Sequence, residues 1–296
     1  MLDFYSLSLN DREWVTHRLL EDDRQACEYS FANNFLWSDI YGVKVAKEQG
    51  CLIFRFQDEN THCYTIPIGA GDRKGALDAL LALERANQKE LVLGTLLQRD
   101  LEWLEQHYPG QYTVETDRDD YDYVYSTEKL STLSGRKLHG KRNHIARFKD
   151  DNNWQYRDMM PEDAGECMRL LDVWKEAEAE NWNDEMENEL HINRRALRNL
   201  ADLVLDGGML YKGGRLVAFS IGEPLNSNTY VVHIEKALAS VQGAYPMINQ
   251  QFVLHNCQDY EFVNREEDTG DEGLRKAKLS YQPALLVEKY QARFHL

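Results

Sequence analysis

A strongly basic segment is the first feature of this chain that could do chemistry. Residues 136–149 contain six lysines or arginines, two histidines and no acid, although the chain as a whole has a net charge of −16. Such dense charge of one sign favours an anion site for the phosphates of a lipid, a nucleotide or a tRNA. The alternative is a solvated basic helix whose charge balances that of the acid-rich residues 161–190. The phosphate-binding candidates in this segment are Arg136, Lys137, Lys141, Arg142 and Asn143.

A polar loop at residues 264–270 is the second feature. It follows an expected strand, and open α/β sheets place ligands at the carboxyl ends of their strands. The helix expected after it carries Arg275 and Lys278 on one face, where a cation could stabilise the oxyanion formed when an amine attacks an acyl ester. Alternatively, both cations complement the dipole of their own helix. Arg275 and Lys278 are the catalytic candidates, and the substrate-binding candidates nearby are Asn264, Arg265, Glu266 and Tyr281.

The third feature is a junction between an expected strand, residues 229–235, and an expected helix that begins near residue 245. Backbone N–H groups at the junction could polarise an acyl carbonyl, and those of the helix N-terminus could bind phosphate. His233 and Glu235 alternate on one face of the strand, where they could act as bases toward the attacking amine. Alternatively, they are polar core or cross-strand residues. The substrate-binding candidates here are His233, Glu235, Gly243, Ala244, Tyr245 and Asn249.

Several other chemistries are disfavoured because their motifs are missing from the sequence. The five cysteines are scattered without a C-x-x-C pair, which disfavours a disulfide scaffold and a zinc knuckle. The sequence contains no H-E-x-x-H, no G-x-S-x-G, no P-loop and no dinucleotide fingerprint. We therefore expect no metal and no tightly bound cofactor, and an acyl donor, aminoacyl-tRNA or acyl-CoA, that acts as a cosubstrate.

Overall charge and hydropathy restrict the partners. Mean hydropathy is −0.62, and no apolar run approaches the roughly 18 residues that a membrane-spanning helix needs. Acids stand near the beginning of the sequence, where a secretory signal would be basic and then apolar, so we expect a cytoplasmic protein without a transmembrane segment. The net charge disfavours general binding to DNA or anionic membranes. The basic segment still predicts a local site for a phosphate-bearing donor or acceptor, tRNA included.

The elements that must position these residues occur twice in one order. Each half reads as a hairpin, a third strand, a helix, a strand, a helix and a closing strand or strands. In the first half these are residues 43–46, 52–56, 63–68, a helix that begins at Asp72, and residues 90–93, 97–107, 112–115 and 121–125. In the second half they are residues 209–212, 215–222, 229–235, 245–256, 260–264, 272–279 and 284–290. A helix pair is also expected around residues 181–183.

This order suits an N-acetyltransferase-like fold. We expect an α+β (α/β-like) protein of two tandem GNAT-like (acyl-CoA N-acyltransferase) domains, each a mixed and mostly antiparallel sheet flanked by helices. The expected domains are residues 1–134 and residues 135–296, the second being catalytic. Residues 240–244 do not fit the acyl-CoA loop pattern Gln/Arg-x-x-Gly-x-Gly/Ala, which disfavours an ordinary acetyl-CoA enzyme.

Two motifs carry a resemblance to a known family. The first contains Tyr123-Val124-Tyr125, Leu133-x-Gly135-x-Lys137, Lys141-Arg142-Asn143-His144-Ile145 and Phe148, and the second is Gly273-Leu274-Arg275-x-x-Lys278-x-x-Tyr281-x-Pro283. Together they resemble the bacterial family of proteins similar to the C-terminal catalytic part of phosphatidylglycerol lysyltransferase. The second motif also resembles the Gly-x-x-x-Phe-Lys-x-x-Phe segment of Fem-type peptidyltransferases, which use aminoacyl-tRNA.

The resemblance implies two tandem acetyltransferase-like domains, with chemistry in the second. It matches Lys278 to the lysine that stabilises the transition state, although the aromatic residue expected just before it is Ala277 here. The implied function is transfer of an activated acyl or aminoacyl group to an amine or hydroxyl by direct attack, without a covalent enzyme intermediate. The alternatives are an acyl-CoA-dependent N-acyltransferase and a non-catalytic anion-binding GNAT-like module.

Overall fold

The computed structural model describes residues 2–58, 61–150 and 152–295. They form two compact units, each with a seven-stranded sheet. The first unit contains Met1–Asp122, Glu267–Gly270 and Leu286–Leu296, and the second contains Tyr123–Glu266 and Asp271–Leu285.

The sheet of the first unit has the strand order β1-β2-β3-β4-β5-β14-β6. The strands β2, β3 and β4 form an antiparallel meander, and β4 then pairs in parallel with β5. The strands are β1 (Tyr5–Ser6), β2 (Lys44–Glu48), β3 (Cys51–Asp58), β4 (Thr61–Tyr64), β5 (Val92–Leu96), β6 (Tyr112–Thr116) and β14 (Tyr290–Phe294). The α-helices are α1 (Arg12–Asp22), α2 (Phe31–Leu36), α3 (Ser38–Tyr41), α4 (Arg73–Ala86) and α5 (Gln98–His107).

Helix α4 shows how the sequence specifies this unit. Ala76, Leu77 and Leu80 recur at helical spacing and are fully buried in the core of the sheet. The Asp72 carboxylate accepts a hydrogen bond from the Gly75 N–H at 2.9 Å and so caps the helix, which confirms the predicted helix start at Asp72.

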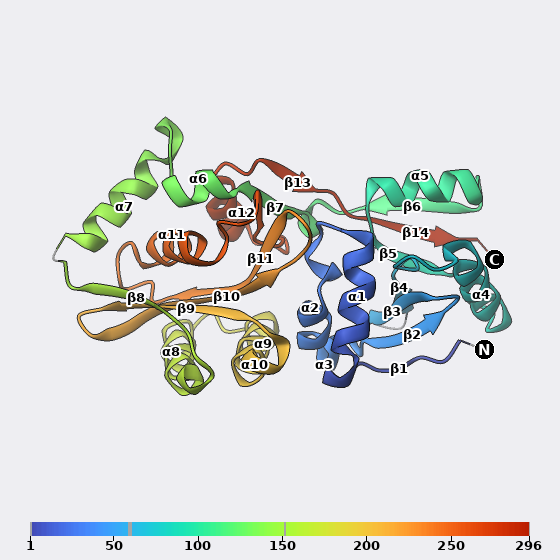
Figure 1. Cartoon of the computed structure of the whole chain (residues 1–296), viewed down its shortest axis with the longest axis horizontal. Coiled ribbons are helices and arrows are strands. Elements are labelled where there is room, and N and C mark those ends of the chain that lie inside the picture. The colour runs from blue at the N-terminus through green and yellow to red at the C-terminus, as the bar shows by residue number, and fades with distance from the viewer. Residues whose placement is uncertain (1, 59–60, 151, 296) are drawn as a thin grey trace. The chain divides into compact units, whose positions relative to one another are not determined.

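The sheet of the second unit has the order β13-β7-β12-β11-β10-β9-β8. In Figure 1 the helices α8, α9 and α10 lie on one face of this sheet, and α6, α7, α11 and α12 lie on the other. The strands are β7 (Asp122–Ser126), β8 (Trp154–Asp158), β9 (Asp206–Lys212), β10 (Arg215–Pro224), β11 (Thr229–Ala237), β12 (Phe262–Asn264) and β13 (Leu285–Val287). The helices are α6 (Thr127–Thr132), α7 (His139–Lys149), α8 (Ala164–Ala177), α9 (Asp184–Arg198), α10 (Leu200–Leu203), α11 (Ala244–Asn256) and α12 (Glu272–Leu279).

The two sheets repeat one plan. In each, an antiparallel meander is followed by a helix and then by a strand that pairs in parallel with the last strand of the meander. This agrees with the predicted tandem GNAT-like fold. The predicted helix pair is also confirmed, as α8 and α9 with a break between them. No helix in the described part of the chain is both long and apolar enough to cross a membrane.

Each sheet takes a strand from the other half of the sequence. Strand β7 pairs antiparallel with β12 in the second sheet, whereas β14 pairs antiparallel with both β5 and β6 in the first. The compact units therefore differ from the predicted domains of residues 1–134 and 135–296, because β7 and β14 are sorted by their pairing partners and not by their position in the chain. The single strand predicted at residues 284–290 is wrong for the same reason: β13 and β14 are separate strands of different sheets.

Candidate functional site

The parallel pair in the second sheet opens at one end. Thr229, Tyr230 and Val231 of β11 pair with β12, which stops at Asn264, while β11 continues to Ala237. The remainder of β11 therefore has no β12 residue beside it, and we call this place the open end. It is the junction at which the sequence predicted backbone N–H groups near an acyl carbonyl.

A charged cluster lies at the open end. The Arg265 guanidinium binds the Glu235 carboxylate with an Nη2–Oε1 distance of 2.9 Å, and the Asn249 amide donates to Glu235 Oε2 at 2.8 Å. The guanidinium also lies 5.5 Å from the ring of Tyr125 and 4.8 Å from that of Tyr281. Burial lowers the pKa of Arg265, but the charge of Glu235, together with Tyr125, Tyr281 and the hydrogen bond to Glu235, outweighs this and the pKa is raised. The arginine therefore stays cationic in a largely dehydrated setting.

Two polar atoms of this cluster are buried without a partner among the described residues: Nη1 of Arg265 and Oδ1 of Asn249. A flip of the Asn249 amide would not satisfy Oδ1, because Nδ2 is needed to donate to Glu235. The site thus presents one charged donor and one acceptor. Leaving such groups unmet costs about 1–3 kcal/mol each, so the arrangement suits a ligand that carries both a carbonyl oxygen and an N–H or O–H.

Lys141 from the basic segment reaches the same cluster. Its ammonium lies 4.0 Å from the ring centre of Tyr281, a buried residue. Burial lowers the pKa of Lys141, and the nearby charge of Arg265 lowers it further. Of the segment's predicted phosphate-binding residues, Lys141 is therefore the one that the structure brings together with Arg265 and Tyr281.

The other residues of the segment have different surroundings. Arg142 donates to the carbonyl oxygens of Leu133 and Gly135, so it stabilises the loop between α6 and α7. Asn143 is exposed, with its amide nitrogen 3.2 Å from Nε2 of His139. Arg136 and Lys137 are exposed on a 3₁₀ turn before α7 and remain candidates for contact with phosphate.

Gly243 fixes how α7 meets the start of α11. Its φ is +84°, and a Cβ there would lie 2.4 Å from the carbonyl oxygen of His144. Glycine tolerates both the left-handed backbone and the close approach. Ala244 begins α11 and is buried, whereas Tyr245 in its first turn is exposed.

Lys278 does not project freely into the open end. Its ammonium is nearly buried and donates to the carbonyl oxygens of Arg265 at 2.7 Å and Glu266 at 3.1 Å. Arg275, one turn earlier on α12, is half-buried. Asn264 helps to shape the same loop, because its side-chain oxygen accepts from the Glu266 N–H at 2.7 Å. Lys278 thus holds the backbone that presents Arg265, and direct contact with substrate stays a prediction.

His233 is held between two carboxylates. Its Nδ1 lies 2.7 Å from Glu266 and its Nε2 lies 3.0 Å from Glu223. Both nitrogens donate only when the imidazole is protonated. Burial lowers the pKa of His233, but hydrogen bonds to Glu223 and Glu266 raise it to about 10. A protonated imidazole has no lone pair to offer, so the sequence-based idea that His233 acts as a base does not fit, whereas its alternative as a cross-strand polar residue does.

The His233 ion pair makes stability depend on pH. A pKa raised from 6.5 to about 10 contributes stability that is fully present below pH 6.5 and is lost as the pH rises through 10. Between pH 7 and pH 9 we expect wild type to lose about 2–3 kcal/mol more unfolding free energy than His233→Gln. Urea unfolding at both pH values measures this difference, and parallel losses in the two proteins would contradict it.

Comparison with known proteins agrees with this architecture. The profile of the family described as "Phosphatidylglycerol lysyltransferase, C-terminal" matches residues 21–293. The chain belongs to this family. A conserved protein of unknown function from Bacteroides thetaiotaomicron has a solved structure that is 36% identical, covers 100% of both chains and has a TM-score of 0.95. The structure of L-PGS from Bacillus licheniformis is 16% identical, covers 95% of this chain and 91% of its own, and has a TM-score of 0.66, which is a likeness of fold.

One curated relative is more distant. An uncharacterized protein from Mycoplasmoides gallisepticum is 24% identical over 212 residues, which are 69% of this chain and 65% of that protein. The chain therefore matches just under two thirds of that relative's length. The predicted membership of this transferase family and the tandem fold are both confirmed.

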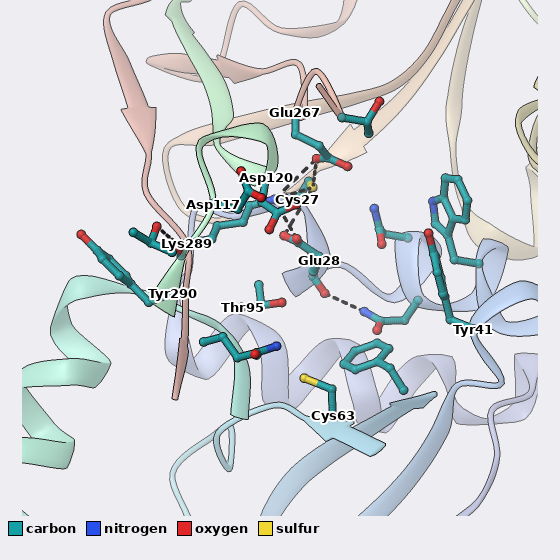
Figure 2. Close-up of a pocket in the computed structure, with 18 of the residues that line it drawn as sticks. Cys27, Glu28, Tyr41, Cys63, Thr95, Asp117, Asp120, Glu267, Lys289 and Tyr290 are labelled. Atoms are coloured by element: carbon teal, nitrogen blue, oxygen red, sulfur yellow. Dashed lines mark hydrogen bonds and ion pairs between the residues drawn. The ribbon is translucent and has the colours of Figure 1, made fainter. Parts of the chain in front are cut away.

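This member of the phosphatidylglycerol lysyltransferase family has a second polar cluster, around Lys289. It was not predicted from the sequence. In the first unit the Lys289 ammonium lies 2.7 Å from both Glu28 and Asp122 and 3.5 Å from Glu267, as Figure 2 illustrates in part. Lys289 falls inside the strand predicted at residues 284–290, and its partners come from three distant segments. A single lysine without a spaced partner leaves no motif, so the sequence offers no signal for this cluster.

Proposed function

We propose that this protein transfers an activated acyl or aminoacyl group to an amine or hydroxyl acceptor at the open end of the second unit. The observation that carries the proposal is that Arg265 Nη1 and Asn249 Oδ1 are buried without a partner among the described residues, while both side chains bind the same Glu235 carboxylate. Membership of a lysyltransferase family supports the same reaction type. A preorganised cationic donor in a dehydrated site is what a developing oxyanion requires.

In this mechanism Arg265 donates from Nη1 to the carbonyl oxygen of the acyl ester. Asn249 accepts from an N–H of the aminoacyl group, which orients the carbonyl for attack. The acceptor's amine or hydroxyl forms a bond to the carbonyl carbon, the ester C–O bond breaks, and the proton of the nucleophile passes to the departing oxygen. Lys278 fixes the carbonyl groups of Arg265 and Glu266 and adds positive charge to the site.

The basic segment supplies the contact with phosphate in this proposal. Arg136 and Lys137 are exposed, and Lys141 extends from the same segment to the open end. A donor or acceptor with phosphate groups, such as aminoacyl-tRNA or an anionic lipid, would be held there while its reactive group meets Arg265. The family description makes a lysyl group and phosphatidylglycerol the first pair to test.

The test is a transfer assay with two donors. Purified protein is mixed with phosphatidylglycerol vesicles and tRNA charged with ¹⁴C-lysine, or with ¹⁴C-acetyl-CoA and a panel of amines. We expect label in the lipid extract from the charged tRNA and none from acetyl-CoA. Transfer from acetyl-CoA would favour the acyl-CoA-dependent alternative, and phosphate-dependent binding without transfer from any charged tRNA would favour the non-catalytic module.

A further inference from the structure

The first unit contains a cavity of about 540 Å³ that the transfer reaction does not use. All the residues that line it belong to that unit. It opens at the parallel pair of the first sheet, where β4 ends at Tyr64 and β5 continues through Gly94 and Thr95. Its volume is within the range of small-molecule sites, and we call it the acidic cavity.

The lining of the acidic cavity is strongly negative. The acidic residues that line it are Glu28, Glu115, Asp117, Asp120 and Glu267. Lys289 is the basic residue in the lining, and its charge is already shared among Glu28, Glu267 and the buried Asp122. Figure 2 shows Asp117, Asp120, Cys27, Glu28 and Glu267 gathered on one side. A cation that entered would meet an excess of carboxylates.

The carboxylates of the cavity are not fully balanced by positive charge, as the raised pKa values of two of them indicate. Burial raises the pKa of Glu28, and although Lys289 opposes the shift, Asp122 and Glu267 add to it, so that the pKa is about 7. Burial also raises the pKa of Asp120, against Lys289 and together with Asp117. Ionisation of both groups would become easier with a further cation in the cavity.

Asn34 independently indicates that a hydrogen-bond donor is missing. This residue lines the cavity and is 1% exposed, and its Oδ1 is buried without a partner among the described residues. Its amide orientation is fixed, because Nδ2 donates to the carbonyl oxygens of Glu28 at 2.6 Å and Ser30 at 2.8 Å. Oδ1 is therefore the atom that is left without a hydrogen-bond donor.

Part of the lining is aromatic. Trp37 and Tyr41 have ring centres 5.5 Å apart, and Phe56 also lines the cavity. Aromatic faces attract ammonium groups and also cover an alkyl chain. The ligand therefore needs an apolar body as well as a charge.

A metal ion fits the cavity less well. Cys27, Asp122 and Glu267 lie close enough together to share one, but the Lys289 ammonium is already 2.7 Å from Asp122 and 3.7 Å from the sulfur of Cys27. Burial and the neighbouring carboxylates raise the pKa of the Cys27 thiol well above its usual value, which disfavours the thiolate that binds metals.

We propose that the acidic cavity binds a small organic ammonium ion, with its N–H groups directed to Asn34 Oδ1 and the carboxylates and its apolar body against Trp37 and Tyr41. The ligand class is a primary alkylamine, free or as part of a larger molecule. None of the residues that line this cavity takes part in the proposed transfer mechanism.

Calorimetric titration of the full chain with n-butylammonium and with uncharged 1-butanol at pH 8 tests this proposal. We expect butylammonium to bind at least tenfold more tightly than butanol, and its affinity to fall as salt rises. Equal affinity for the two, or displacement of butylammonium by an equimolar amount of Zn²⁺, would overturn the proposal.

Variants locate the binding. Asn34→Ala should weaken butylammonium binding about tenfold, because it removes the unpartnered acceptor. Asp120→Asn keeps the size and shape of the side chain, so it should fold normally and weaken binding about threefold. The matched control is Glu102→Gln, which removes one exposed carboxylate of the same unit outside the cavity and should leave binding unchanged. An equal loss in Asp120→Asn and Glu102→Gln would contradict the location.

Discussion

Replacement of Arg265 by glutamine is expected to lower the rate of acyl transfer roughly 100- to 1,000-fold, the usual effect of removing one donor to an oxyanion. The loss should appear in the turnover number and not in the Michaelis constant, because Nη1 would act chiefly on charge that develops in the transition state. The measurement is the initial rate of label transfer from charged tRNA. Arg215→Gln, which removes an exposed arginine of the same unit, is the matched control and should retain full activity.

Folding must be separated from activity at this position. Arg265→Gln leaves Glu235 with Asn249 as its remaining partner among those described above, and an uncompensated buried charge is destabilising. The double variant Arg265→Gln with Glu235→Gln removes both charges and should unfold at nearly the wild-type temperature while staying inactive. Wild-type rates in that double variant would refute the role of Arg265.

Replacement of Lys289 by methionine is expected to destabilise the protein by about 3–5 kcal/mol. Lys289 is nearly buried, and its charge is shared among Glu28, Asp122 and Glu267; burial lowers its pKa, but the neighbouring groups, Asp122 above all, raise it well above the usual value. Methionine would fill the space without supplying the charge. Urea unfolding at pH 8 measures the change, and Lys89→Met, which removes an exposed lysine of the same unit, should change stability by less than about 0.5 kcal/mol.

A second substitution tests the cause of this loss. Adding Asp122→Asn to Lys289→Met removes the carboxylate that is fully buried and 2.7 Å from the ammonium, so it should restore part of the lost stability. If the double variant were less stable than Lys289→Met alone, the loss would come from packing and not from the unpaired charge.

Much of the fold could be predicted because local sequence patterns determine it. The buried leucines of α4, its Asp72 cap and the bounds of α11 and α12 all follow from residues within one or two turns. Strand exchange could not be predicted in this way. No residue pattern within β14 indicates that its partners are β5 and β6, which end 194 and 174 residues earlier.

The candidate site also has a part that the sequence predicts and a part that it does not. Charge and spacing predicted Arg265, Glu235 and Lys141 as site residues, which stays a prediction, and the structure places them around Tyr281 and Asn249. The partners of buried groups depend on tertiary contacts that spacing does not encode. The second carboxylate on His233 comes from another strand, and the acceptors of Lys278 are backbone atoms 12 and 13 residues earlier, in the loop before its helix.

The exchange of β7 and β14 also determines when the strands of the first sheet can pair during translation. Strands β5 and β6 are complete once Thr116 has been made, but the strand that belongs between them begins at Tyr290, 174 residues later. At about 5–20 residues per second, the ribosome takes roughly 10–35 seconds to supply it. During that interval the nascent chain carries two unpaired strand edges, which are templates for aggregation. We therefore expect the nascent chain to be more prone to aggregation than that of an acetyltransferase domain with sequential strands.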